Sequence, residues 1–66
     1  MERDYINYLL NECVENIRFG GDRYTEIDFT INCLEVVVNR DFTKSEWESA
    51  SKLINDYVNS RLGGNR

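Results

Sequence analysis

A chain of 66 residues can enclose only one small hydrophobic core. A domain of this size buries about 60% of the surface that its unfolded chain exposes, so small domains usually gain stability from disulfides, metal ions or oligomerisation. Two Cys residues and no His cannot supply the four ligands of a structural zinc site. One bridge between Cys13 and Cys33 is the most that disulfides can offer. We therefore expect oligomerisation or a bound partner to supply the additional stability.

Acidic residues exceed basic residues by 12 to 8, which gives a formal net charge of −4. This balance argues against direct nucleic-acid binding and against binding to an anionic membrane surface, because both depend on basic side chains. The polar residues after Met1 do not form the apolar stretch of a signal peptide. No apolar run approaches the roughly 20 residues of a transmembrane helix. We expect a soluble, cytoplasmic protein whose partners have basic surfaces.

The first segment, residues 2–18, has the apolar spacing of an amphipathic helix. Its apolar residues recur every three or four positions, at Ile6, Leu10, Cys13 and Ile17. Gly20 and Gly21 follow, and glycine commonly provides the left-handed backbone that ends a helix. The sequence therefore predicts a helix that stops just before this pair.

The last segment, residues 44–62, carries the clearest helix start. Thr43 and Glu46 fit a capping box, in which each side chain bonds to the backbone of the other residue. Phe42 and Trp47 have the spacing of the hydrophobic staple that often accompanies such a box. A second helix is predicted here.

Between these helices, apolar and polar residues alternate, which is typical of a half-buried strand. The pattern predicts strands over residues 24–31 and 34–40, joined at Asn32 and Cys33 as an antiparallel hairpin. This register places apolar residues opposite one another on one face, in the pairs Ile31–Leu34, Phe29–Val36 and Ile27–Val38.

The predicted fold is therefore an α+β domain over residues 1–66 in the order α-β-β-α. Two helices would pack on one face of the hairpin. A single hairpin leaves two exposed edges and is only marginally stable. We accordingly expect a homodimer, in which two hairpins could join into a four-stranded sheet.

The sequence offers few side chains suited to catalysis. The chain has no His to act as a base near neutral pH. Cys13 lies on the apolar stripe of the first helix, and Cys33 is placed at the predicted hairpin tip. We expect no enzyme activity, no metal site and no cofactor.

Two acidic surfaces are candidates for binding a partner. Glu26, Asp28 and Glu35 share the polar face of the predicted hairpin. A solvated face would also carry such charges, and in the sharpest interpretation the three carboxylates mimic nucleic-acid phosphates. On the first helix, Tyr8 lies among acidic residues as an interface aromatic would. Those neighbours are Asp4, Glu12 and Glu15.

The leading hypothesis is a non-enzymatic module that inhibits or regulates a larger protein by covering its basic surface. The short, acidic profile is similar to that of small phage or mobile-element inhibitor proteins. One alternative is an assembly protein that oligomerises, or extends a partner's sheet, through its hairpin edges. The other is a nucleic-acid mimic.

Overall fold

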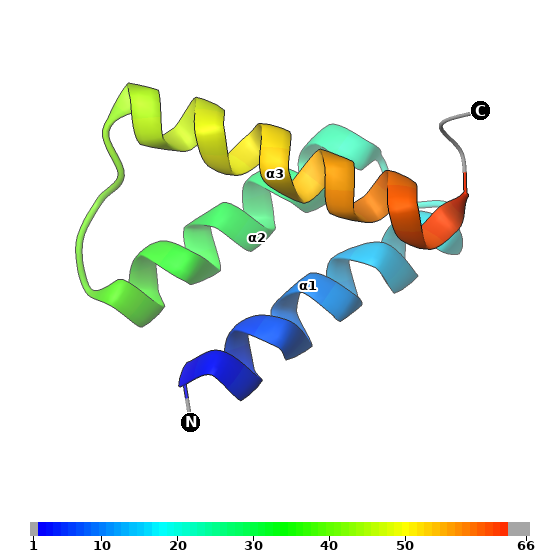
Figure 1. The fold of residues 1–66 in the computed structure, drawn as a ribbon, viewed down its shortest axis with the longest axis horizontal. Helices are drawn as coiled ribbons and strands as arrows, with labels where there is room; N and C mark the ends of the chain where they lie inside the picture. Colours follow the sequence, from blue (N-terminus) through cyan, green and yellow to red (C-terminus); the bar gives the residue numbers. More distant parts are fainter. Residues whose placement is uncertain (1, 64–66) are drawn as a thin grey trace.

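The chain folds into three helices around one core in the computed structural model, which describes residues 2–63 (Figure 1). The helices are α1 (Glu2–Arg18), α2 (Arg23–Val38) and α3 (Lys44–Leu62). In Figure 1, α1 and α3 run from left to right and α2 runs back between them. All three pairs of helices are in contact. Within residues 2–63 no segment is a strand.

The predicted hairpin is wrong, because the strands over 24–31 and 34–40 are one continuous helix, α2. The α+β fold class, the α-β-β-α order and the four-stranded dimer sheet are corrected with it. Ile27, Ile31 and Leu34 keep helical spacing and face the other helices. Phe29 and Val36 interrupt that spacing and are exposed. Because α2 is apolar on two faces, its sequence also alternates with a period of two.

The sequence just before α2 contains a helix start signal, Asp22, which competes with the strand pattern. Asp22 is the N-cap, and its carboxylate accepts hydrogen bonds from the Thr25 amide at 2.9 Å and the Thr25 hydroxyl at 3.0 Å. An N-cap aspartate satisfies a backbone N–H that a helix otherwise leaves unpaired. The Asp22 side chain therefore helps to define where α2 begins.

The predicted ends of the first helix are confirmed. The Gly21 amide bonds to the Asn16 carbonyl at 2.8 Å, and the Gly20 amide bonds to the Ile17 carbonyl at 3.1 Å. This pair of bonds is a Schellman motif, and Gly20 supplies its left-handed residue with φ +108°. The glycine pair thus ends α1 as expected.

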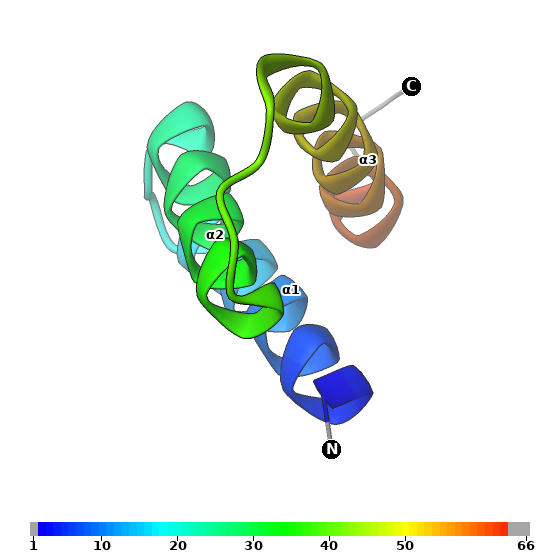
Figure 2. The same cartoon turned by 90° about the vertical axis from the view of Figure 1, so that its left-hand side faces the viewer.

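The predicted capping box of the last helix is also confirmed. The Glu46 amide donates to the Thr43 hydroxyl at 3.1 Å, and the Thr43 amide donates to the Glu46 carboxylate at 2.9 Å. Phe42 and Trp47, the predicted staple, both pack against the core. The segment that crosses from α2 to α3 is visible in Figure 2.

The core lies where the three helices meet. Its buried side chains are Cys13, Val14, Ile27, Ile31, Ile54 and Val58. Polar side chains tie the helices together around this core. Arg23 of α2 donates to Asn55 and Asn59 of α3 at 2.7 and 3.0 Å. The Tyr57 hydroxyl of α3 donates to Asn11 of α1 at 2.8 Å.

Candidate functional site

A narrow cleft of about 140 Å³ lies between α1 and α2. From α1 it is lined by Tyr8, Leu9, Glu12, Cys13 and Asn16, and from α2 by Glu26, Phe29 and Thr30. We call it the α1–α2 cleft. Tyr8, Glu12 and Asn16 are each four residues apart, so helical spacing alone brings them to one side of α1.

The charge of the cleft is negative. Glu12 is exposed, and Glu26 is half-buried and accepts a hydrogen bond from the Asn16 side chain at 3.0 Å. Within the described chain, no Lys or Arg lines this cleft. Two carboxylates without a cation among the lining residues attract a positively charged group from outside.

Aromatic rings border the same cleft. Tyr8 is 56% exposed, and its ring stacks on Tyr5 with a centroid distance of 6.2 Å. Phe29 is 61% exposed on the α2 side. The faces of aromatic rings attract Lys and Arg side chains within about 6 Å, most strongly where water is excluded. Rings and carboxylates together therefore favour a guanidinium or an ammonium group.

Two buried residues at the floor of the cleft, Cys13 and Thr30, have little chemical reactivity. Cys13 is 2% exposed, and burial raises the pKa of its thiol. The Thr30 hydroxyl donates to the Glu26 carbonyl within α2 at 2.8 Å. A buried thiol with a raised pKa is a poor nucleophile, because the thiolate is the reactive form. Cys13 is therefore a poor candidate for a nucleophile at this cleft.

Three of the predicted partner-binding residues come together in this cleft: Tyr8, Glu12 and Glu26. The remaining three lie elsewhere. Glu15 pairs with Arg18 at 3.5 Å, and Asp28 is exposed on α2 outside the cleft. Glu35 accepts a hydrogen bond from the Phe42 amide at 2.7 Å in the turn before α3.

The prediction that Glu26, Asp28 and Glu35 share one face is therefore wrong. In the predicted hairpin, Asp28 and Glu35 lie on the same face as Glu26, two and nine positions after it. On a helix, a separation of two residues turns the side chain by about 200°, because each residue advances about 100°. The helix therefore separates Glu26 from Asp28, and Glu35 instead stabilises the turn.

Sequence reasoning missed Tyr5, Asn16 and Phe29 at this site. Phe29 was assigned to the buried face of the hairpin, whereas it is an exposed edge of the cleft. Glu26 and Phe29 are three residues apart, so a helical interpretation of α2 would have placed them together.

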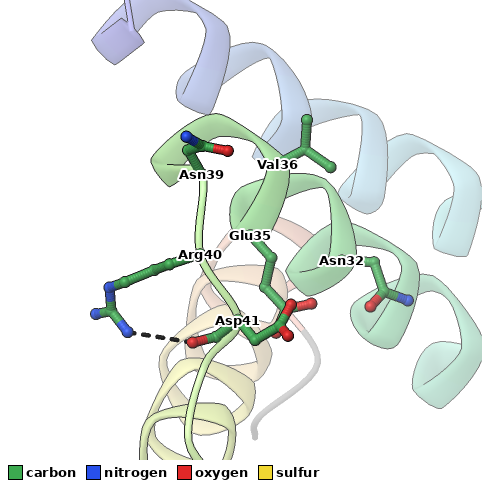
Figure 3. A pocket seen from close by; sticks show the side chains of 6 residues that line it. All are labelled: Asn32, Glu35, Val36, Asn39, Arg40 and Asp41. Atoms are coloured by element: carbon green, nitrogen blue, oxygen red, sulfur yellow. Dashed lines mark hydrogen bonds between the residues drawn. The ribbon is translucent and has the colours of Figure 1, made fainter.

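The other hollows lined by the described residues include two larger ones. An apolar groove of about 270 Å³ is lined by Ile6, Leu10, Leu34, Ala50, Leu53, Ile54 and Tyr57. An open hollow of about 530 Å³ lies at the end of α2 (Figure 3). Its lining residues are Asn32, Glu35, Val36, Asn39, Arg40 and Asp41.

Residues 2–63 contain no group of three or more acidic, Cys or His side chains placed to hold a metal ion. None of the helices described is long and apolar enough to cross a bilayer. Comparisons with protein-family models, with curated proteins and with solved structures found no match to this chain.

Proposed function

We propose that this protein is a non-enzymatic binding module that regulates or inhibits a larger protein by covering a basic surface. One observation carries the proposal: Tyr8, Glu12, Glu26 and Phe29 line a single cleft between α1 and α2. The module places an arginine or lysine side chain of its partner in this cleft.

The chemistry of the cleft supports a cationic side chain as the bound group. An ammonium or guanidinium over an aromatic ring contributes about 0.5–2 kcal/mol, depending on how far it is desolvated. A charge-assisted hydrogen bond to Glu12 or Glu26 adds to this and fixes direction. The net charge of −4 speeds the encounter with a basic surface.

The two alternative functions lose their structural basis. Extension of a partner's sheet needs an exposed strand edge, and residues 2–63 contain no strand. Phosphate mimicry rested on three carboxylates on one face, but α2 turns Glu26 away from Asp28, and the Glu35 carboxylate accepts a hydrogen bond from the Phe42 amide. Self-association does not need a strand, so the expected homodimer stays a prediction.

The test is a titration with a short arginine-rich peptide, followed by ¹⁵N–¹H NMR spectra of the labelled protein. We expect the amide signals of residues around the cleft to shift, and the shifts to weaken as salt is added. The same peptide with citrulline in place of arginine keeps the size of the side chain and removes its charge. Equal shifts with the citrulline peptide would contradict the proposal.

A pair of variants separates the cleft from net charge. Glu12→Lys and Asp28→Lys each replace an exposed helical carboxylate with a lysine, but only Glu12 lines the cleft. We expect Glu12→Lys to weaken peptide binding at least about tenfold, and Asp28→Lys to weaken it much less. Equal losses would show that the peptide responds only to overall charge.

A further inference from the structure

One of the two carboxylates in the α1–α2 cleft is held in place by the neighbouring helix. The Asn16 side chain of α1 donates from Nδ2 to Glu26 Oε1 of α2 at 3.0 Å. Glu26 is half-buried, whereas Glu12 is exposed. A carboxylate has about four lone-pair sites, so Glu26 keeps acceptor capacity beyond this bond. Asn16 therefore restricts the orientation in which Glu26 meets a ligand.

Gly21 gives the Glu26 carboxylate the space in which it lies. Gly21 does not share the left-handed backbone of Gly20, whose φ is +108°, so backbone geometry alone does not require glycine here. Close approach does require it. A Cβ at position 21 would lie 3.1 Å from Glu26 Oε2 and 2.8 Å from the Asn16 carbonyl oxygen. The carboxylate thus has Asn16 at one oxygen and Gly21 beside the other.

The cations nearest to this carboxylate in the chain are engaged elsewhere. Arg18 and Arg23 flank the turn between α1 and α2. Arg18 pairs with Glu15 at 3.5 Å, and Arg23 donates to two asparagines of α3 at 2.7 and 3.0 Å. Neither arginine lines the cleft. The Glu26 carboxylate is therefore available to N–H donors from outside the chain.

The remaining lining suits a flat cation better than a compact one. Leu9, Cys13 and Thr30 are buried in the cleft, while Tyr8 and Phe29 are exposed rings at its border. A guanidinium is planar, stacks on aromatic rings and carries several N–H donors in a fixed fork. An ammonium is a compact charge that binds water more strongly. Buried, mostly apolar side chains offer an ammonium little to replace that water.

We propose that the α1–α2 cleft selects arginine over lysine side chains, and that Asn16 is the positioning residue that sets this selection by holding Glu26. The inference rests on the proposed function, because it concerns the same cleft. The guanidinium stacks on a ring at the border of the cleft and donates to the Glu26 carboxylate in the orientation that Asn16 fixes. The basic surface that this protein covers therefore presents an arginine.

The experiment compares two peptides that carry either arginine or lysine at the same positions and have the same charge. Their Kd values are measured by ¹⁵N–¹H NMR titration of the full-length chain, from the signals of residues around the cleft. We expect the arginine peptide to bind at least about fivefold more tightly. A third peptide with dimethylated arginines keeps the charge but blocks bidentate donation, so it should bind less tightly than the arginine peptide.

A pair of variants tests the role of Asn16. Asn16→Ala and Asn7→Ala each replace an exposed asparagine of α1 with a better helix former, and only Asn16 lines the cleft. Asn16→Ala is expected to reduce the ratio of arginine to lysine affinity at least about threefold, and Asn7→Ala to leave it unchanged. A general loss of structure would weaken both peptides together. Circular dichroism confirms that both variants fold.

Equal affinities for the arginine and lysine peptides overturn the selection and leave the proposed function standing. Binding of neither peptide overturns both. Equal affinities for arginine and dimethylated arginine overturn the donation to Glu26. An arginine preference that Asn16→Ala leaves unchanged, or that Asn7→Ala reduces equally, overturns the positioning role of Asn16.

Discussion

At the scale of single residues, the helix ends depend on a few backbone positions with unusual geometry. Asn39 follows α2 with φ +61° and is the only residue other than glycine with positive φ among residues 2–63. Its amide bonds to the Val36 carbonyl, and the Arg40 amide bonds to the Glu35 carbonyl, each at 3.2 Å. This is the same Schellman pattern that glycine completes after α1. Asparagine tolerates the left-handed region better than other residues with a side chain.

Asn39→Gly should therefore keep or raise the free energy of unfolding, because it removes the remaining strain. Asn39→Val should lower it by about 1–2 kcal/mol, because a β-branched side chain clashes in the left-handed region. Urea unfolding followed by circular dichroism measures both variants. Equal stabilities would show that this turn does not require positive φ.

Two carboxylates at helix starts make stability depend on pH. Hydrogen bonds from the Arg40 side chain and the Thr43 amide lower the pKa of Glu46 from its ordinary 4.5 to about 2. The Thr25 amide, which donates to its side chain, lowers the pKa of Asp22. Both carboxylates therefore favour the folded state when ionised.

Because these folded-state pKa values lie below the ordinary values, the stabilisation is present above about pH 4.5 and is lost as the pH falls toward 2. We expect the melting temperature to fall across that range. Glu46→Gln keeps a hydrogen-bonding side chain but does not titrate, so it should reduce the fall. Melting curves at several pH values provide the measurement, and an unchanged slope in the variant would contradict this assignment.

At the scale of elements, α2 is where the sequence pattern and the structure disagree. The hairpin interpretation placed Phe29 and Ile31 on the same buried face. In the helix, Ile31 is 0% exposed and Phe29 is 61% exposed. The two residues are two positions apart, so a strand predicts similar losses of stability when either is substituted, whereas the helix predicts a large loss only at Ile31.

Ile31→Ala should lower the free energy of unfolding by about 2–5 kcal/mol, because it leaves a cavity in the core. Phe29→Ala should change it by less than about 0.5 kcal/mol, since most of the ring is already in water. Thermal unfolding at low protein concentration, where association does not contribute, compares the two. Similar losses for both variants would contradict the exposed position of Phe29.

At the scale of the whole molecule, the small core limits the stability of the fold. Within residues 2–63, a cluster of six buried side chains forms the centre of the core, and several large apolar side chains remain exposed. A domain of this size has only a few kcal/mol of stability to lose. Association of two copies would therefore be a measurable part of its stability.

If the expected homodimer forms, the melting temperature should rise with protein concentration, because binding stabilises the folded state by mass action. Differential scanning calorimetry over a wide range of concentrations tests it. A melting temperature independent of concentration in the unsubstituted chain would argue against the dimer.

The local signals in the sequence determined both outer helices. The glycine pair at 20–21 ends α1, and Thr43 with Glu46 begins α3, because these caps depend on residues within one helical turn. The same reasoning identified Cys13 as a core residue and Tyr8 as exposed. Tyr8 and Glu12 could be grouped from the sequence, since both lie on α1.

Only the tertiary structure decided the middle of the chain. The run from Thr25 to Val38 is rich in β-branched residues and apolar on two faces, so helix and strand periods both fit it. Packing of Ile27 and Ile31 against α1 and α3 selects the helix, because this arrangement buries them in one core. That choice brings Glu26 and Phe29 to the cleft beside Tyr8, and it leaves Val36 exposed on α2. Such long-range burial is a property of three helices together, and no short stretch of sequence contains it.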